Sequence, residues 1–276
     1  GDGKLFVQDG LRHGLAFDRE GRPQACMGIA VADADFDGRI DLFVTNFYNE
    51  ANVFYRQRST GQFFDATKAA GLSQTSWNLV GFGTQFIDGE LDGNPDLVLV
   101  NGHVDDFTKL GQPWRMKAQY FRNAGDARFV ELTDLGPYFG QELLGRAMAK
   151  LDVDRDGRED LAISHLESPV ALLVNRTARV GHSLTIRLVA TTTARDAIGT
   201  TVTLRVGDWT RSAQLTAGDG YMASNQRQLV FGLGDRDEIG ELTVEWPSGA
   251  EATYRNVAAG VELVIVEGAA TPIRLP

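Results

Sequence analysis

Three acidic loops are the residues of this chain best suited to chemistry. Each loop carries carboxylates at positions 1, 3, 5 and 9 and a glycine at position 6. The loops run over residues 33–41, 88–96 and 152–160. A hard cation such as calcium takes about six to eight oxygen ligands at about 2.3–2.6 Å, and position 7 can add its backbone carbonyl. The spacing therefore predicts a calcium ion in each loop, about three in all.

Each expected shell has four carboxylates, one carbonyl and water. The predicted ligands are Asp33, Asp35, Asp37, Asp41 and the Arg39 carbonyl; Asp88, Glu90, Asp92, Asp96 and the Asn94 carbonyl; Asp152, Asp154, Asp156, Asp160 and the Arg158 carbonyl. The glycine permits a left-handed turn. Without a cation, carboxylates this close would repel one another and some of their pKa values would rise. Because Glu90 carries an extra methylene and Pro95 stiffens the exit, we expect the middle loop to bind calcium most weakly.

The loops are not EF-hands. An EF-hand requires a glutamate at position 12 and flanking helices, whereas position 12 is Val44, Leu99 or Ile163 here. Short apolar runs follow each loop and predict buried strands. A solvated acidic turn without a metal ion is the competing interpretation.

The loops belong to a longer repeat. They begin 55 and 64 residues apart, at residues 33, 88 and 152. An aromatic residue after a turn precedes each loop, and Asn46, Asn101 or His165 follows it. A last apolar segment ends each unit, near residues 53–56, 120–123 and 172–175. This period, with about four short strands per unit, is typical of propeller blades. An insertion after residues 101–103 accounts for the longer second interval.

The C-terminal part predicts a second β-domain. Apolar and polar residues alternate over residues 184–189, 202–206 and 242–246. Such alternation between glycine-rich turns indicates half-buried antiparallel strands in a sandwich or barrel. We found no amphipathic helix longer than two turns, so we predict an all-β protein. Its expected parts are a partial propeller of about three blades over 1–178, a small β-sandwich or barrel over 179–268, and a tail over 269–276.

At this point the chain resembles a known family. The loops and their strands resemble FG-GAP repeats, also called VCBS repeats. Four C-terminal segments resemble the ASPIC/UnbV domain: Arg195-Asp196-Ala197-Ile198-Gly199, Gly218-Asp219-Gly220-Tyr221, Phe231-Gly232-Leu233-Gly234 and Trp246-Pro247-Ser248-Gly249. Together they are similar to bacterial members of the cartilage acidic protein family. The resemblance implies calcium-binding propeller blades followed by an ASPIC/UnbV domain.

Composition restricts the possible functions. The net charge is −10, but removing the 12 loop carboxylates from 37 acidic residues leaves 25 against 27 basic ones. The remaining surface lacks the basic excess expected of a nucleic-acid-binding protein. No apolar run is long enough for a transmembrane helix, and Cys26 is the single cysteine, which we expect to be buried. Weak calcium loops need extracellular calcium, so we expect an extracellular, cell-surface or periplasmic location.

Catalytic signatures are scarce. The four histidines lie in no metal-ligand spacing, and His103 beside Asp105 and Asp106 is the one cluster that suggests an active site. We therefore favour a non-catalytic adhesion module that binds a protein or glycan partner, with calcium rigidifying the blade loops. The alternative is a propeller-scaffold enzyme, a hydrolase or lyase with structural calcium and an axial active site. Convergence of His103, Asp105 and Asp106 with another carboxylate or histidine would favour the enzyme.

Three blades are too few to close a propeller ring. An open array exposes strand edges, which proteins cover or avoid. We therefore expect missing N-terminal blades, or else an oligomeric partner, to cover the open blade edge. Closure of the array by the chain's own C-terminal domain would contradict this expectation.

Overall fold

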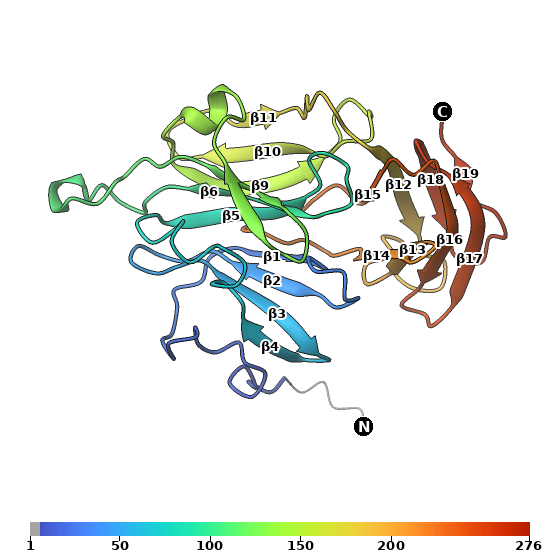
Figure 1. Cartoon of the computed structure of the whole chain (residues 1–276), viewed down its shortest axis with the longest axis horizontal. Coiled ribbons are helices and arrows are strands. Elements are labelled where there is room, and N and C mark those ends of the chain that lie inside the picture. The colour runs from blue at the N-terminus through green and yellow to red at the C-terminus, as the bar shows by residue number, and fades with distance from the viewer. Residues whose placement is uncertain (1–5) are drawn as a thin grey trace.

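The chain is built from β-strands. A computed structural model describes residues 6–276, so part of the turn predicted at the N-terminus lies outside the described residues. The described helices are two 3₁₀ turns, η1 (Thr108–Leu110) and η2 (Pro137–Gly140). Neither is long or apolar enough to cross a membrane. The all-β prediction is confirmed (Figure 1).

Each acidic loop joins the first two strands of a small antiparallel sheet. The first sheet contains β1 (Ile29–Ala32), β2 (Asp41–Val44), β3 (Val53–Ser59) and β4 (Gln62–Asp65). The second contains β5 (Gly81–Ile87), β6 (Asp96–Asn101), β7 (Gln119–Asn123) and β8 (Phe129–Leu132). The third contains β9 (Gly145–Leu151), β10 (Asp160–His165) and β11 (Ala171–Leu173). We call these three sheets blades 1, 2 and 3.

The blades pack face to face through their apolar side chains. Phe43 and Phe54 of blade 1 share a buried cluster with Leu97 and Leu99 of blade 2. On the opposite face of β6, Val98 packs in a cluster that extends into blade 3. Because successive side chains of a strand point to opposite faces, the continuous apolar run of β6 fills both interfaces. This explains why the run after the second loop is hydrophobic without alternation.

The C-terminal part forms two further sheets. One has the order β15-β12-β18-β19, with β15 (Leu229–Gly234), β12 (His182–Val189), β18 (Val261–Val266) and β19 (Ile273–Arg274). The other has the order β14-β13-β16-β17, with β14 (Trp209–Gln214), β13 (Thr201–Val206), β16 (Glu238–Glu245) and β17 (Glu251–Ala258). Both sheets contribute to one hydrophobic cluster. The predicted alternating segments fall in β12, β13 and β16.

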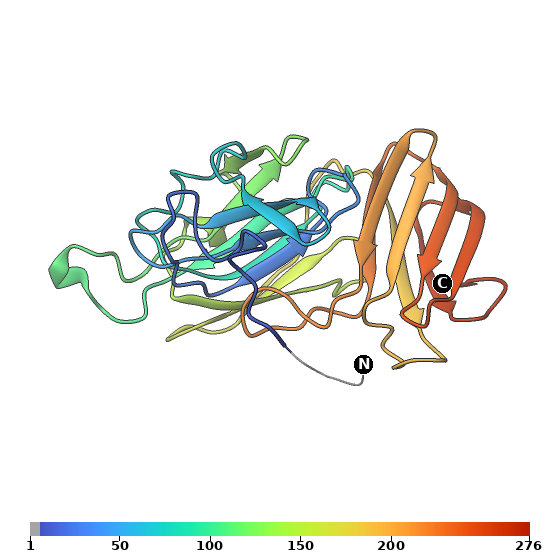
Figure 2. The ribbon, with the colours of Figure 1, turned by 90° about the horizontal axis from the view of Figure 1, so that it is seen from below.

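The described chain thus has five small sheets in a propeller-like arrangement, more than the three predicted blades. Figure 2 shows the two C-terminal sheets beside the blades, at the end of the molecule toward which the acidic loops point. The prediction of three units came from the number of acidic loops, and the last two sheets carry no such loop. Their alternation predicted a separate domain instead.

A long connection between β14 and β15 reaches the first strands of all three blades. The backbone N–H of Ile29 in β1 donates to the Gly220 carbonyl over 3.0 Å. The Asn225 carboxamide donates to Gln85 Oε1 of β5 over 3.0 Å and accepts from the Lys150 N–H of β9 over 2.8 Å. This connection carries the Gly218–Tyr221 motif. It ties the C-terminal domain to the centre of the blade array.

Glu267 holds another motif of the C-terminal domain in place. Its carboxylate accepts a hydrogen bond from the Ser248 hydroxyl and from the backbone N–H groups of Thr191 and Thr192, each of the latter over 2.8 Å. The Ser248 bond, followed by the two backbone bonds, lowers the pKa of Glu267 to about 2. Ser248 belongs to the Trp246–Gly249 turn, so one carboxylate joins two separate loops.

We predict that Glu267→Gln lowers the melting temperature by a few degrees at neutral pH. A lowered pKa in the folded state contributes stability above the ordinary glutamate pKa of about 4.3, and this stability is lost as the pH falls toward 2. The difference between variant and wild type should therefore shrink in acid. Melting curves at neutral pH and between about pH 4.3 and about pH 2, the limits of this window, measure it. Exposed Glu245 at the end of β16 provides the control Glu245→Gln. A difference that stays constant over this range would contradict the assignment.

Candidate metal centres

The three acidic loops have the same backbone conformation. Position 4 is left-handed in each, with φ of 65° at Phe36, 56° at Leu91 and 58° at Arg155. The glycine at position 6 is left-handed as well, with φ between 80° and 88°. Left-handed backbone is uncommon outside glycine and costs about 1–3 kcal/mol where it is strained. Its occurrence at the same position in three loops shows that the acidic pattern specifies one backbone conformation.

The first carboxylate organises each loop by accepting two backbone hydrogen bonds. Asp33 accepts from the N–H groups at positions 5 and 6, each over 3.0 Å. Asp88 and Asp152 accept from the same positions at 2.8–3.1 Å. The carboxylate at position 5 accepts from the N–H at position 7 in all three loops. These bonds turn the acidic side chains toward the interior of the loop.

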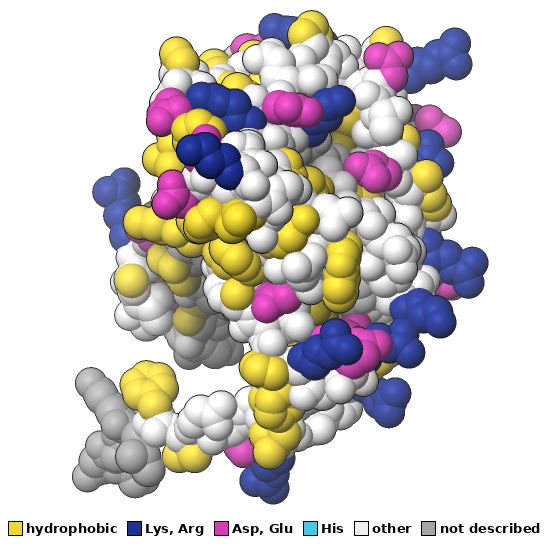
Figure 3. Space-filling view, turned by 90° about the vertical axis from the view of Figure 1, so that its left-hand side faces the viewer, with side chains coloured by type: hydrophobic (Ala, Val, Ile, Leu, Met, Phe, Trp, Pro, Cys, Tyr) yellow, Lys and Arg dark blue, Asp and Glu magenta, His cyan; other side chains and the backbone are white. Residues whose placement is uncertain are grey.

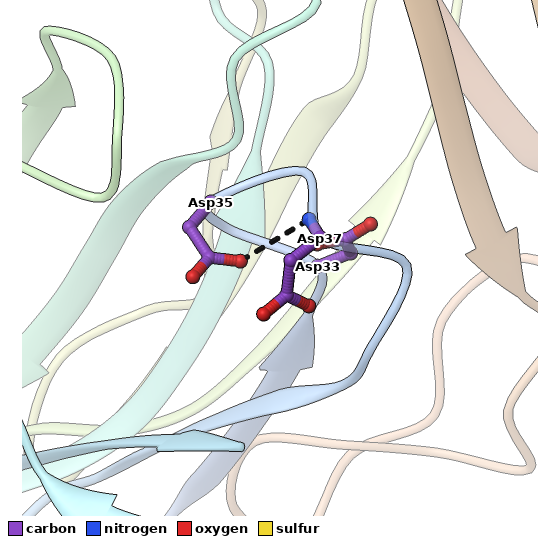
Figure 4. A group of neighbouring side chains, drawn as sticks. All are labelled: Asp33, Asp35 and Asp37. Atoms are coloured by element: carbon purple, nitrogen blue, oxygen red, sulfur yellow. Dashed lines mark hydrogen bonds between the residues drawn. The ribbon is translucent and has the colours of Figure 1, made fainter. Parts of the chain in front are cut away.

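Two of the loops bring three carboxylates together. The side chains of Asp33, Asp35 and Asp37 offer oxygen atoms that all lie within 4.8 Å of one another (Figure 4). Asp152, Asp154 and Asp156 do the same. Oxygens that share one calcium ion at about 2.4 Å lie at most about 4.8 Å apart, so both clusters fit a calcium ion. Among the described residues, the side chains of the middle loop form no such cluster.

The carboxylate at position 9 lies deeper than the others. Asp41, Asp96 and Asp160 are almost completely buried and begin the second strand of each blade. Each accepts a hydrogen bond from a residue in or just after the next strand: from the N–H of Gln57 over 2.9 Å, of Asn123 over 2.7 Å and of Asn175 over 2.7 Å. These aspartates therefore anchor the loop to its blade. As the predicted metal ligands, these carboxylates would coordinate the ion through oxygen lone pairs that do not accept these hydrogen bonds.

Burial without a cation disfavours the charged form of these carboxylates. Desolvation, with smaller contributions from the nearby Asp37 and Asp33, raises the pKa of Asp41 to about 7. Burial also raises the pKa of Asp88 to about 7. For Asp96 burial, followed by a hydrogen bond with Glu90, raises the pKa to about 8. The loops thus hold negative charge that a bound cation would stabilise.

Arginines contact these acidic clusters, and sequence reasoning missed them. Arg56 of β3 pairs with Asp35, and Arg176, just after β11, approaches Asp154 over 2.9 Å. Arg122 lies 3.9 Å from Glu90. The signal was available, because a basic residue lies in or just after the third strand of every repeat. The position-7 residues Arg39 and Arg158 also pair with the position-5 aspartates of their own loops.

The middle loop packs against the C-terminal domain. A Cβ atom on Gly232 of β15 would lie 1.9 Å from Asp88 Oδ2, so only glycine fits there. The N–H groups of Gly181 and Gly234 donate to the carbonyls of Glu90 and Leu91, each over 2.8 Å. Two glycines of the Phe231–Gly234 motif thus contact this loop.

Arg211 of β14 joins the first two loops. Its Nε donates to the Gly93 carbonyl over 2.6 Å, and its guanidinium lies 3.3 Å from the centre of the Phe36 ring. It also stacks on Trp209 at 4.9 Å. Desolvation by burial lowers the pKa of Arg211 to about 10, although Asp33, Asp88 and Asp92 oppose this shift. This guanidinium places positive charge beside the middle loop.

The third loop meets the same domain through an ion pair and a close backbone approach. Arg155 lies 2.8 Å from Glu262 of β18, and a Cβ atom on Gly157 would approach the Ser183 hydroxyl of β12 within 2.5 Å. All three acidic loops therefore lie against the C-terminal sheets. A change in the order of these loops would therefore change the contact between the blades and the C-terminal domain.

The residues that suggested an active site do not converge. His103 is buried, with its ring centre 5.2 Å from that of Phe47 and 4.9 Å from that of Phe107, and desolvation lowers its pKa. Asp105 and Asp106 are exposed, and their carboxylates accept hydrogen bonds from backbone groups of their own loop. Figure 3 shows hydrophobic and charged side chains on this end of the molecule, but no histidine. The convergence of His103, Asp105 and Asp106 that would favour an enzyme is therefore not seen.

The prediction that Cys26 is buried is wrong. Its side chain is exposed, and its backbone φ of 41° is left-handed. Cys26 lies in irregular chain before β1 rather than in the strand. Periodicity carries no information about side-chain burial in such a segment.

Comparison with known proteins agrees with this architecture. Residues 190–272 match the ASPIC and UnbV family. Cartilage acidic protein 1 of Homo sapiens is 27% identical over 238 residues, which cover 84% of this chain and 34% of that protein. Cartilage acidic protein 1 of Mus musculus is 26% identical over 237 residues, covering 84% and 35%. The chain spans about a third of the length of these curated relatives. Residues 190–272 therefore resemble the ASPIC and UnbV family, and most of the chain is similar to about a third of cartilage acidic protein 1.

Proposed function

We propose that the chain is a non-catalytic, extracellular calcium-binding module that engages a protein or glycan partner. The observation that carries the proposal is the pair of carboxylate clusters at Asp33, Asp35, Asp37 and at Asp152, Asp154, Asp156. Loops of one sequence pattern hold both clusters in one backbone conformation. Calcium supplies the positive charge that these loops otherwise draw from arginine side chains.

Calcium in these loops would rigidify the joint between the blades and the C-terminal domain. The first loop presents Phe36 to Arg211, and the third presents Arg155 to Glu262. A cation that links positions 1, 3 and 5 removes their mutual repulsion and fixes the residue at position 4 between them. The contacts made by position 4 then cost less conformational entropy to form.

We further propose that additional blades cover the open side of blade 3. This blade has three strands where the other two have four, and β11 is its edge. Leu172 and Val170 at this edge are 51% and 70% exposed. Light scattering on Leu172→Glu tests the alternative of a second copy. We expect a monomer before and after the substitution, and a dimer that dissociates on substitution would assign the edge to self-association.

Removal of calcium should lower the melting temperature. A ligand that binds only the native state stabilises it by about 2.7 kcal/mol at a hundredfold excess over its dissociation constant. In a chain of this size that amounts to about 5–10 °C for each occupied site. Scanning calorimetry with millimolar calcium and with excess chelator measures the difference. Magnesium at the same concentration controls for ionic strength, and an unchanged melting curve in chelator would refute calcium binding.

The middle loop should contribute least to calcium binding. Its carboxylates do not cluster as those of the other two loops do, and Arg211 lies beside it. We expect Asp37→Ala and Asp156→Ala each to remove about one calcium ion per chain, and Asp92→Ala to change the binding far less. Calcium titration calorimetry of the three variants provides the comparison. The hierarchy is wrong if Asp92→Ala causes the largest loss of binding.

A further inference from the structure

A cavity of about 650 Å³ lies between the blades and one edge of the C-terminal domain. Residues from the first loop, Asp33 and Arg39, line it on one side. Lys150 of β9 and the connection between β14 and β15 line its inner end. On the other side it is lined by six consecutive residues, 211–216. This run contains the second half of β14.

Strand β14 is an edge strand. It pairs with β13 on one side, and no strand of the described chain pairs with its other side. An antiparallel ladder uses the main-chain groups of alternate residues, and the residues between them direct N–H and C=O away from the partner strand. An edge strand therefore presents a row of main-chain donors and acceptors.

The hydrogen bonds beside β14 show which residues face outward. Leu215 donates its N–H to Thr200 over 2.9 Å and accepts from Gly199 over 2.8 Å, so its main chain faces the β13 side. The pairing continues without a bulge from there to Trp209. Alternation then directs the main-chain groups of Thr210, Ser212 and Gln214 toward the open edge.

These outward groups lack partners in the described chain. The Thr210 carbonyl accepts from the Arg211 guanidinium over 2.9 Å. Within residues 6–276, the main-chain N–H and C=O of Ser212 and Gln214 have no hydrogen-bond partner away from β13. Both residues border the cavity. Two donors and two acceptors therefore lie along a strand edge that borders the cavity, which residues 228–232 at the start of β15 also line.

We propose that this cavity binds an extended segment of a partner protein, which adds to β14 as a strand. Alternating main-chain N–H and C=O groups along a second strand match the free groups of β14. The outward residues span about 13 Å at about 3.3 Å per residue, which an added strand of about five residues covers. Saccharide hydroxyls have no such fixed alternation. The proposal deepens the partner-binding role proposed above and does not depend on calcium occupancy.

The charges around the cavity indicate a segment of low net charge. Four carboxylates and three basic groups line it: Asp33, Asp88, Glu159, Asp219, Arg39, Lys150 and Arg211. Lys150 and Glu159 pair with each other over 3.0 Å. The near balance of charge leaves main-chain pairing as the main source of affinity.

A random peptide library displayed on phage, selected on the whole chain in millimolar calcium, tests the proposal. We expect enriched peptides whose affinity falls about tenfold or more in Ser212→Pro, which removes an outward N–H. Proline is tolerated where the N–H of an edge strand faces outward, so β14 should keep its pairing with β13. The matched control is Thr253→Pro on β17, the opposite edge of the same sheet. Affinity in this control should stay within about twofold of the wild type.

Backbone methylation of an enriched peptide gives a test that needs no protein variant. N-methylation at alternate residues should abolish binding in one register and preserve it in the other, because only one set of N–H groups pairs with β14. Failure to enrich any peptide, equal loss in both proline variants, or equal effects of methylation in both registers would overturn the proposal. Binding of neutral oligosaccharides that Ser212→Pro leaves unchanged would assign the cavity to a glycan instead.

Discussion

Repulsion among carboxylates held in three small loops of the same geometry is the constraint on which the rest of this structure depends. Each loop needs its position-1 carboxylate to fix the backbone and its position-9 carboxylate to anchor the following strands. Both groups sit where solvent cannot fully stabilise their charge. The carboxylates cannot be removed without losing the loop, so positive charge must come to them. Arginines in or just after the third strands supply part of it, and the proposed calcium ions supply the rest.

The same loops form the contact with the C-terminal domain, so loop order and domain arrangement are linked. The second loop fits closely against Gly232, where any larger residue would strike Asp88. The first loop reaches Arg211 through Phe36. The connection that carries Gly220 and Asn225 extends to the inner strands of the blades. Two segments of the ASPIC/UnbV pattern, Gly218–Tyr221 and Phe231–Gly234, therefore join two parts of the chain. Three of the four segments also contribute to the core of the domain itself, through Ala197, Phe231, Leu233 and Trp246.

Local sequence patterns predicted what local physics determines. The left-handed glycines of the loops, the continuous apolar strand of residues 97–100 and the alternating strand of residues 184–189 all follow from spacing and turn chemistry. Long-range contacts were beyond such reasoning. Arg56 and Asp35 lie 21 residues apart in sequence, and Arg211 meets a loop more than a hundred residues away. Burial in irregular segments was equally hidden, as exposed Cys26 shows. The number of sheets exceeded the prediction because the repeat signal resides in the acidic loops alone.

Anomalous diffraction from crystals grown in calcium tests the central claim most directly. The account predicts one strong anomalous peak among Asp33, Asp35 and Asp37 and another among Asp152, Asp154 and Asp156, with Arg56 and Arg176 displaced from the aspartates they contact. A weaker peak or none is expected in the middle loop. Crystals in millimolar calcium that show no peak in the first and third loops, with both arginines still paired to Asp35 and Asp154, would contradict it.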